Sequence, residues 1–481
     1  MDVQNGDVIA AVSSPSFDPN LFVRGISNTD FRFLMDHDHR PMANKAVQGA
    51  YPPGSTFKMV TALAALEEGM ITPETTFRCP GYLESGGRKF HCWRHGGHGT
   101  VDLERSLSES CDVYYYEVAL KVGIDKIAEM GRRLGLGMRH DLPMSAIAEG
   151  NMPDKAWKME RHKAEWRIGD TVNASIGQGY VLASPLQLAV MTARLATGRA
   201  VNPRLVRAIE GREIPVEPAE PLGLSTSNLT AVLGGMDAVM NGKSGTARSS
   251  RVVAEDMRMA GKTGTAQVRN ISAAERASGV ISNDQLPWNR RDHALFVGYA
   301  PYEAPRYAVS VVVEHGGGGS TAAAPIARDV ILRALYGETP PVEAYPSSQR
   351  GRIETMLKGL KLRLPDGSAL HLDTATRLNA RLYRQRREVM LIEGQARFEV
   401  QADARRPFHV LAGGARITVV GTRFAVRYTP GMAGYDGVRV AVEEGRVQVA
   451  VHGAAPVLLT AAQAACSKLK AAGFDCSVVS G

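Results

Sequence analysis

The sequence lacks any long hydrophobic run and any N-terminal targeting segment. No apolar stretch approaches the roughly 18 residues of a membrane-spanning helix, and the first residues have neither the basic start nor the apolar core of a signal peptide. We therefore expect the chain as given to be soluble. A buried strand is predicted at 8–12 with no lead-in, which leads us to expect that sequence upstream of Met1 is missing.

Strong charge bias is also absent. The 57 Lys and Arg residues only slightly outnumber the 49 Asp and Glu residues, and the excess is spread along the chain, so we expect no nucleic-acid partner. Hydrophobic residues make up 44% and charged residues 22%, which excludes disorder or a coiled coil as the overall class. A length of 481 residues suggests about three domains, or two with a long connection.

Cysteine is scarce, and its five residues cannot form a complete set of disulfides. Cys79, Cys92 and Cys111 nevertheless cluster, and together with His98 they supply four ligands suited to tetrahedral zinc. The two-residue spacing of a zinc finger is absent. A Cys79–Cys92 disulfide in an oxidising compartment and isolated buried thiols therefore remain open alternatives.

The order of predicted elements indicates an α+β domain followed by an all-β module. After the first strand we expect helices at 56–68 and 103–122, strands at 259–268, 294–299 and 307–314, and a helix at 322–336. We place the first domain at 1–345, a linker rich in breakers at 346–361, the β-rich domain at 362–462, and a C-terminal fragment at 463–481.

The sharpest chemical signal is Ser55 with Lys58, after a Tyr-Pro-Pro-Gly turn. The spacing puts both side chains on one face of a helix start. A buried lysine can take the proton of a serine nucleophile, and the helix N-terminus favours a developing oxyanion. Taken alone, the Ser-x-x-Lys pattern favours a capped helix whose lysine is exposed to solvent. The same pattern recurs at Ser467 and Lys470.

Two further elements in the right order reverse that expectation. Ser110-Cys111-Asp112 falls in the second predicted helix, and Lys262-Thr263-Gly264-Thr265 falls in a late strand. A rival for the latter occurs at Lys243–Thr246. We prefer Lys262 because its flanks predict an edge strand, whereas Lys243 follows a loop-like Met-Asn-Gly.

These three elements in this order are typical of penicillin-binding proteins and serine β-lactamases. With the runs 6–15, 51–58, 150–153, 176–179 and 262–268, residues 1 to about 340 resemble penicillin-binding protein 2, the elongation-specific class B D,D-transpeptidases. The resemblance implies the penicillin-binding fold, an antiparallel sheet plus a helical subdomain. It also implies a periplasmic location. The membrane anchor and pedestal domain that the family carries before this point are missing from the sequence.

The resemblance also implies roles for individual residues. Ser55 would attack the penultimate D-alanine carbonyl of a peptidoglycan stem peptide, with Lys58 as base, Ser110 as proton relay and Asp112 holding the network where many relatives have Asn. Substrate carboxylate binding would fall to Lys262, Thr263, Gly264 and Thr265, and the oxyanion hole to the N–H groups of Ser55 and Thr265.

The implied partners are D-Ala-D-Ala peptides, β-lactams that acylate Ser55, and membrane proteins of the elongation machinery. A β-lactamase or D,D-carboxypeptidase of the same fold is the alternative, although no clear loop supplies a deacylating water. An inactive scaffold or sensor is a further alternative, which the intact set of Ser55, Lys58 and Lys262 disfavours.

Two more resemblances concern the cysteines and the C-terminal part. Cys79, Cys92, His98 and Cys111 resemble the structural zinc site of some elongation-specific penicillin-binding proteins. The runs 364–368, 387–398, 406–410 and 421–424 are similar to the periplasmic domain of FecR-type regulators, which implies a partner such as the signalling domain of an outer-membrane transporter. Residues 465–479 are similar to the end of a peptidoglycan-binding SPOR domain, so the chain looks like a fusion.

Overall fold

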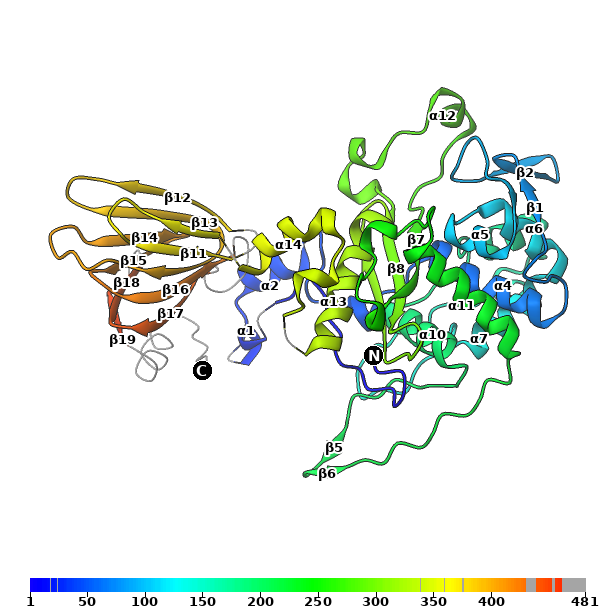
Figure 1. Ribbon diagram of the computed structural model, residues 1–481, viewed down its shortest axis with the longest axis horizontal. Helices are drawn as coiled ribbons and strands as arrows, with labels where there is room; N and C mark the ends of the chain where they lie inside the picture. Colours follow the sequence, from blue (N-terminus) through cyan, green and yellow to red (C-terminus); the bar gives the residue numbers. More distant parts are fainter. Residues whose placement is uncertain are drawn as a thin grey trace. The chain divides into compact units, whose positions relative to one another are not determined.

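The computed structural model describes residues 1–481 except 18, 24, 338, 359, 374–375, 430–437, 452–454 and 461–481 (Figure 1). The chain divides into two compact units. Unit 1 consists of Met1–Ser13 and Ala43–Ser348, and unit 2 of Ser14–Met42 and the residues from Gln349 on. The segment expected as a linker contains helix α14 (Ser347–Lys358). The expected SPOR-like tail lies outside the described residues.

Unit 1 is built on a three-stranded antiparallel sheet in the order β7–β8–β9. The strands are β7 (Ala260–Ala266), β8 (His293–Ala300) and β9 (Tyr307–Val313), so the three predicted strands are confirmed. Helices α10 (Pro185–Thr197) and α13 (Ala324–Tyr336) pack on β8 and β9. In the part of the chain that the structure describes, strand β7 pairs with β8 on one side only, so its other edge has no neighbouring strand.

The strand predicted at 8–12 is not formed. Ile9 and Val12 are 56% and 80% exposed, and only Asp7, just before them, forms a bridge, with Arg204. The residues before the turn pair with β9 instead, where the Ala308 N–H donates to Met1 O at 2.9 Å. An isolated apolar run cannot become a strand without a neighbour to complete its hydrogen bonds.

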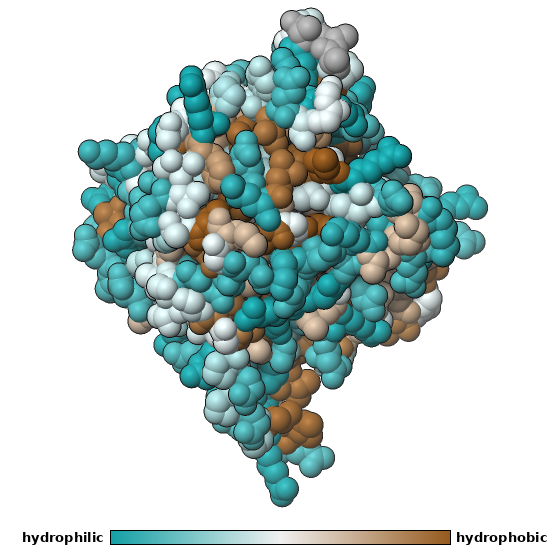
Figure 2. All heavy atoms as spheres, turned by 90° about the vertical axis from the view of Figure 1, so that its right-hand side faces the viewer, coloured by the Kyte–Doolittle hydropathy of each residue, from teal (hydrophilic) through white to brown (hydrophobic). Residues whose placement is uncertain are grey.

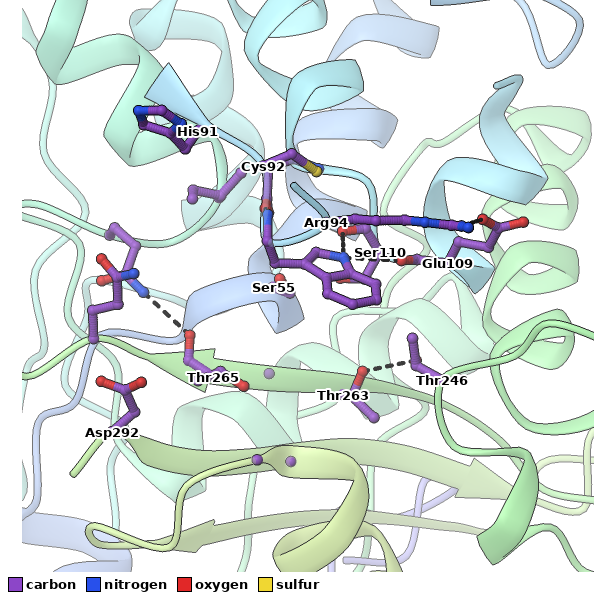
Figure 3. Close-up of a pocket in the computed structure, with 18 of the residues that line it drawn as sticks. Ser55, His91, Cys92, Arg94, Glu109, Ser110, Thr246, Thr263, Thr265 and Asp292 are labelled. Carbon is purple, nitrogen blue, oxygen red and sulfur yellow. Dashed lines mark hydrogen bonds and ion pairs between the residues drawn. The ribbon is translucent and has the colours of Figure 1, made fainter. Parts of the chain in front are cut away.

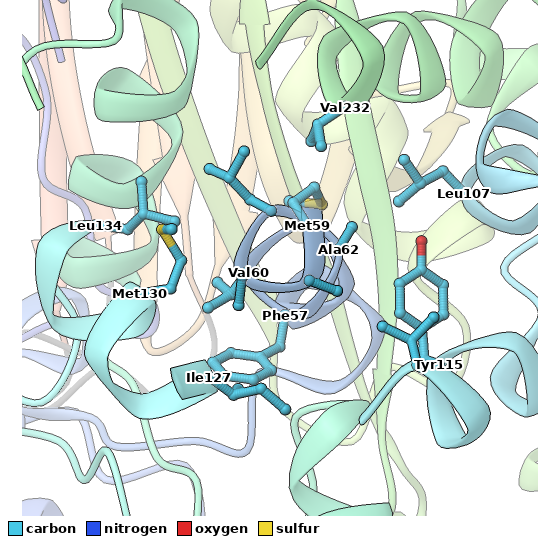
Figure 4. Packing of buried hydrophobic residues seen from close by; sticks show 14 of the residues in the cluster. Phe57, Met59, Val60, Ala62, Leu107, Tyr115, Ile127, Met130, Leu134 and Val232 are labelled. Atoms are coloured by element: carbon cyan, nitrogen blue, oxygen red, sulfur yellow. The ribbon is translucent and has the colours of Figure 1, made fainter. Parts of the chain in front are cut away.

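Helix α4 (Lys58–Glu67) forms the centre of the helical part of unit 1. Every residue from 58 to 66 is buried, so this helix has no solvent face. Figure 4 shows α4 surrounded by side chains from its neighbours, including Leu107, Tyr115, Ile127 and Val232. The surrounding helices are α5 (Leu103–Ser108), α6 (Asp112–Val122), α7 (Ile124–Arg133) and α11 (Thr226–Asn241).

The single helix predicted at 103–122 is wrong, because the structure breaks it between α5 and α6. Ser110 lies in the break with φ of 56°, in the left-handed region that a continuous helix does not allow. The Cys111 N–H still donates to Ser106 O at 2.9 Å, so the break is compact. The break turns the Ser110 side chain out of the helix register.

Apart from single 3₁₀ and π turns, the remaining helices and strands of unit 1 are short. They are α3 (Lys45–Gln48), β1 (Phe77–Cys79), β2 (Tyr82–Ser85), β3 (Arg88–His91), β4 (Gly99–Val101), α8 (Lys155–His162), α9 (Ile168–Ser175), β5 (Ala208–Ile209), β6 (Arg212–Glu213) and α12 (Ala273–Ser278). The β5–β6 hairpin ends a long arm that carries exposed apolar side chains such as Ile209, and this arm forms the lower tip in Figure 2. Among the described residues, no helix is both long and apolar enough to cross a membrane.

Unit 2 carries a ten-stranded sheet, as predicted for an all-β module. Its strands are β10 (Leu360–Arg363), β11 (Ala369–Leu372), β12 (Arg377–Leu382), β13 (Arg387–Glu399), β14 (Phe408–Ala412), β15 (Ala415–Val419), β16 (Arg423–Tyr428), β17 (Val438–Glu444), β18 (Arg446–Val451) and β19 (Val457–Thr460). Unit 2 also contains α1 (Asn20–Val23) and α2 (Asn28–Met35). Arg387 is fully buried and pairs with Asp366 at 2.8 Å, an ion pair that fixes the 365–367 turn to β13.

Candidate active site

Ser55 lies in a single 3₁₀ turn, Gly54–Phe57, that leads into α4. Gly54 has φ of 55°, and a Cβ at this position would lie 2.5 Å from the carbonyl oxygen of Thr265. Only glycine allows the turn to approach β7 this closely. Ser55 is half-buried, lines a cavity and lies beside the edge of β7.

Lys58 is completely buried, one turn further along. Its Nζ donates to Ser110 O at 2.8 Å, to Ser110 Oγ at 3.1 Å and to Asp112 Oδ1 at 2.7 Å. Within the described residues, none of its hydrogen bonds goes to Ser55. Burial raises the pKa of Asp112, and the positive charge of Lys58 opposes that rise. The lysine and the carboxylate therefore compensate each other's loss of water.

Lys262 is also completely buried and reaches the same serine from the opposite side. Its Nζ donates to Ser110 Oγ at 2.9 Å and to Thr263 O at 3.1 Å. Burial, and then the charge of Lys58, hold the pKa of Lys262 well below its ordinary value. The Ser110 hydroxyl thus contacts the Nζ atoms of two lysines that come from α4 and β7.

The cavity has a volume of about 990 Å³. Figure 3 shows Ser55 near its centre, with Ser110 above and Thr263 and Thr265 below on β7. Thr263, Gly264 and Thr265 all line it, whereas Lys58 and Lys262 lie behind Ser110. The structure therefore brings together every residue predicted for catalysis and substrate binding, with the two lysines one layer deeper.

The rival element at Lys243–Thr246 is a turn, and Lys243 is exposed, so the preference for the Lys262 strand is consistent with the structure. Two of its residues nevertheless belong to the cavity. Ser244 and Thr246 line it, and Thr246 Oγ1 lies 2.9 Å from Thr263 Oγ1. The repeated Ser/Thr-Gly-Thr pattern was the available signal for these two residues, which sequence reasoning set aside.

Trp93 is a second group that sequence reasoning missed. Its backbone N–H donates to Asp112 Oδ2 at 2.9 Å, and its indole N–H donates to Ser110 O at 3.0 Å. The side chain is 58% exposed at the cavity. Its position directly after Cys92 was the only hint in the sequence that Trp93 lies at this site.

The predicted metal ligands form one buried cluster. The ligand atoms of Cys79, Cys92, His98 and Cys111 all lie within 4.8 Å of one another, and the three cysteines are free thiols. His98 Nδ1 lies 3.6 Å from Cys79 Sγ and 3.5 Å from Cys92 Sγ. A hydrogen bond from the Cys111 thiol lowers the pKa of Cys92, whereas burial raises the pKa of Cys79 and the hydrogen bond with Cys92 raises that of Cys111. The cluster can bind a metal ion.

The cluster touches the catalytic segment directly. Cys111 is the residue between Ser110 and Asp112 and caps α6. The backbone N–H of Asp112 donates to Cys92 Sγ at 3.4 Å. Whatever holds the thiols in place therefore also fixes the backbone that presents Ser110 and Asp112.

Comparison with known families identifies the domain that carries this site. The family model of the penicillin binding protein transpeptidase domain matches residues 1–332, more than two thirds of the chain. The chain belongs to the penicillin-binding protein transpeptidase family. The family model of the FecR protein matches residues 352–448, so a FecR region follows the penicillin-binding domain. The predicted fold class of both parts is confirmed.

Relatives of this penicillin-binding domain include peptidoglycan D,D-transpeptidase MrdA of Haemophilus influenzae, 41% identical over 355 residues that cover 72% of this chain and 54% of the relative. MrdA of Escherichia coli is 37% identical and covers 70% and 54%. The chain thus spans about half the length of the curated relatives it matches.

Solved structures of penicillin-binding proteins are similar to the same part of the chain. Pseudomonas aeruginosa PBP2 in complex with WCK 5153 is 39% identical, with a TM-score of 0.62 and coverage of 72% of this chain and 73% of the other. The complex of PBP2 and MreC from Helicobacter pylori is 36% identical, with a TM-score of 0.61 and coverage of 70% and 59%.

The close approach of Gly54 to β7 gives a first prediction. Gly54→Ala should lower thermal stability and the reactivity of Ser55, because a methyl group would collide with the Thr265 carbonyl. Gly86→Ala is the matched control, since Gly86 has φ of 58° and a Cβ there would meet no heavy atom within 4 Å. Both variants carry the backbone cost of about 1–3 kcal/mol. Equal losses in calorimetry would contradict the steric argument.

Proposed function

We propose that this protein is a serine D,D-transpeptidase that cross-links peptidoglycan stem peptides and is acylated by β-lactams. The observation that carries the proposal is the position of Ser110 Oγ, 3.1 Å from Lys58 Nζ and 2.9 Å from Lys262 Nζ, beside Ser55 in a single cavity. The relatives named peptidoglycan D,D-transpeptidase support the same assignment.

In this proposal Ser55 Oγ attacks the carbonyl of the penultimate D-alanine, and the bond to the terminal D-alanine breaks. Lys58 is the base that takes the Ser55 proton, and Ser110 relays a proton from Lys58 to the departing D-alanine nitrogen and ends the step unchanged. An amine of a second stem peptide then attacks the acyl-enzyme and restores Ser55. Asp112 keeps Lys58 aligned through their 2.7 Å contact.

Substrate orientation depends on the edge of β7. Thr263 and Thr265 line the cavity and would bind the terminal carboxylate through their hydroxyls, while the buried Lys262 would contribute through Ser110, to which its Nζ donates. The N–H groups of Ser55 and Thr265 would stabilise the oxyanion. Gly264 keeps β7 close to the serine turn, because a Cβ there would lie 2.9 Å from Thr56 Cγ2.

We further propose that the cysteine cluster holds one structural zinc ion. Three thiols and one imidazole within 4.8 Å match the ligand set of closed zinc sites. The alternative Cys79–Cys92 disulfide leaves the approach of His98 Nδ1 to both sulfur atoms unexplained. Zinc would fix the position of Cys111 at the start of α6, and with it the backbone of Ser110 and Asp112, without entering the cavity.

The proposed setting is the periplasm, with an inner-membrane anchor in the full-length family. The solved complexes of a relative with MreC and of a peptidoglycan synthase support partners from the elongation machinery. For the FecR region we propose binding of a partner protein, such as the signalling domain of an outer-membrane transporter. The proposed domain limits remain 1–345, 346–361, 362–462 and 463–481.

A fluorescent penicillin should label the protein covalently at Ser55. Ser55→Ala should abolish labelling without changing the melting temperature, because Ser55 is a half-buried turn residue and not part of the core. Ser467 is the other serine in a Ser-x-x-Lys pattern, and the Ser467→Ala variant should still be labelled fully. Peptide mapping that finds the label elsewhere refutes the assignment. An acyl-enzyme that lasts seconds instead of hours indicates a β-lactamase or carboxypeptidase.

Lys262→Ala should slow acylation by about tenfold or more, because a charge-assisted contact contributes about 1.5–3 kcal/mol. Lys243→Ala should change the rate little, since Lys243 is an exposed turn residue. Rates are measured by stopped-flow with a fluorescent penicillin, and thermal melting shows whether each variant is folded. The reverse ranking would assign the carboxylate to the Lys243 turn.

The protein as purified should contain about one zinc ion per chain. A cysteine thiol must lose its proton to bind zinc, so zinc affinity should fall as the pH is lowered. Chelation should lower both the melting temperature and the rate of acylation, since the ligands adjoin Ser110 and Asp112. Absence of metal in elemental analysis, together with thiols at Cys79 and Cys92 that react only after reduction, would establish the disulfide instead.

A further inference from the structure

One end of the cavity is cationic. Figure 3 places His91 and Thr246 on opposite sides of Ser55, with Thr265 and Asp292 on the side of His91. Lys89 lies two residues before His91 on β3, so both side chains leave the same face of that strand. Both line the cavity, as does Arg276 of α12. Lys89, His91, His95 and Arg276 line the cavity together, and Arg276 and Lys89 are near enough for their charges, after burial, to lower the pKa of His91.

The acidic residues of the cavity offset this positive charge only in part, because Glu109 and Asp112 are paired with other cations and Asp292 lies on the side of His91 (Figure 3). Glu109 accepts hydrogen bonds from Arg105 at 2.7 Å and Arg94 at 3.4 Å. Asp112 pairs with Lys58, and the Asp292 carboxylate accepts hydrogen bonds from Asn283 Nδ2 and the Val268 N–H.

Among the described residues, Lys89 and Arg276 have no ion pair. Lys89 Nζ lies 4.3 Å from the centre of the Tyr82 ring, which leaves its charge available to a ligand. Two segments that are far apart in the sequence, β3 and α12, therefore bring two cations to the same end of the cavity.

We propose that Lys89 and Arg276 bind a carboxylate on the peptide substrate, on the residue that precedes its D-Ala-D-Ala end. The inference rests on the proposed function for the direction of the peptide. If the terminal carboxylate lies at Thr263 and the reacting carbonyl at Ser55, the upstream residue lies beyond Thr265, at the cationic end. The site thereby prefers peptides whose upstream residue has a free acid over peptides in which that acid is amidated.

Two peptide thioesters test this preference. Both end in D-alanyl-thioglycolate, and they differ only in a carboxylate or a carboxamide on the upstream residue. Acylation forms the Ser55 ester and releases thioglycolate, so intact mass gives both rates. The acid should react about tenfold faster than the amide, which corresponds to one favourable charged contact. Raising the ionic strength should reduce the ratio.

The ratio in variants separates the cationic end from the rest of the site. It should fall to about one in the double variant Lys89→Gln/Arg276→Gln and partly in each single variant. Arg290→Gln is the matched control, because Arg290 is exposed near α12 and does not line the cavity, and it should keep the wild-type ratio. Equal rates for acid and amide with the wild-type protein overturn the inference.

Failure of the proposed function gives a different result. If benzylpenicillin and both thioesters leave Ser55 unmodified, the transpeptidase assignment fails. Fluorescence anisotropy with the labelled D-Ala-D-Ala forms of the same two peptides then still decides the inference. Tighter binding of the acid that is lost in the double variant supports a carboxylate site, and equal binding of acid and amide refutes it.

Discussion

The amino groups of two lysines, Lys58 and Lys262, are removed from water and meet at one serine hydroxyl. Burying a charge is tolerated only when partners replace the water, and here the partners are Asp112, the Ser110 carbonyl and the Ser110 hydroxyl. The loss of one partner from such a buried pair costs about 3–5 kcal/mol. The helical part and the sheet of unit 1 are therefore joined at this serine.

This constraint explains several local features that look unrelated. Ser110 adopts φ of 56° between α5 and α6, which aims its hydroxyl between the lysines. Helix α4 has no solvent face, so the Lys58 side chain cannot reach water and its Nζ donates to Asp112 instead. Gly54 lets the turn that carries Ser55 rest against Thr265. Together these features bring Ser55, Ser110 and the edge of β7 to one cavity, with Lys58 directly behind them.

The thiol cluster extends the same network away from the cavity. Cys111 separates Ser110 from Asp112, and Cys92 Sγ accepts the Asp112 N–H, while the next residue, Trp93, donates to Asp112 and Ser110. A bound metal would thus act on the geometry of the catalytic segment without contacting substrate. The charged end at Lys89 and Arg276 lies on the opposite side of Ser55 from Thr246 and adds selectivity for the peptide rather than reactivity.

The sequence by itself determined the family and the order of the three motifs, and it favoured the Lys262 strand over the Lys243 turn, because these depend on residue types at fixed local spacings. It also indicated an all-β C-terminal module from alternating strands. It could not show that the 8–12 run lacks a neighbour, that the 103–122 helix breaks at Ser110, or that Ser244, Thr246 and Trp93 line the cavity. Those outcomes depend on contacts between segments distant in sequence, such as the Gly54–Phe57 turn with β7 and α5 with α11. Only the tertiary structure brings them together, because burial and pairing are properties of packed neighbours and not of a single segment.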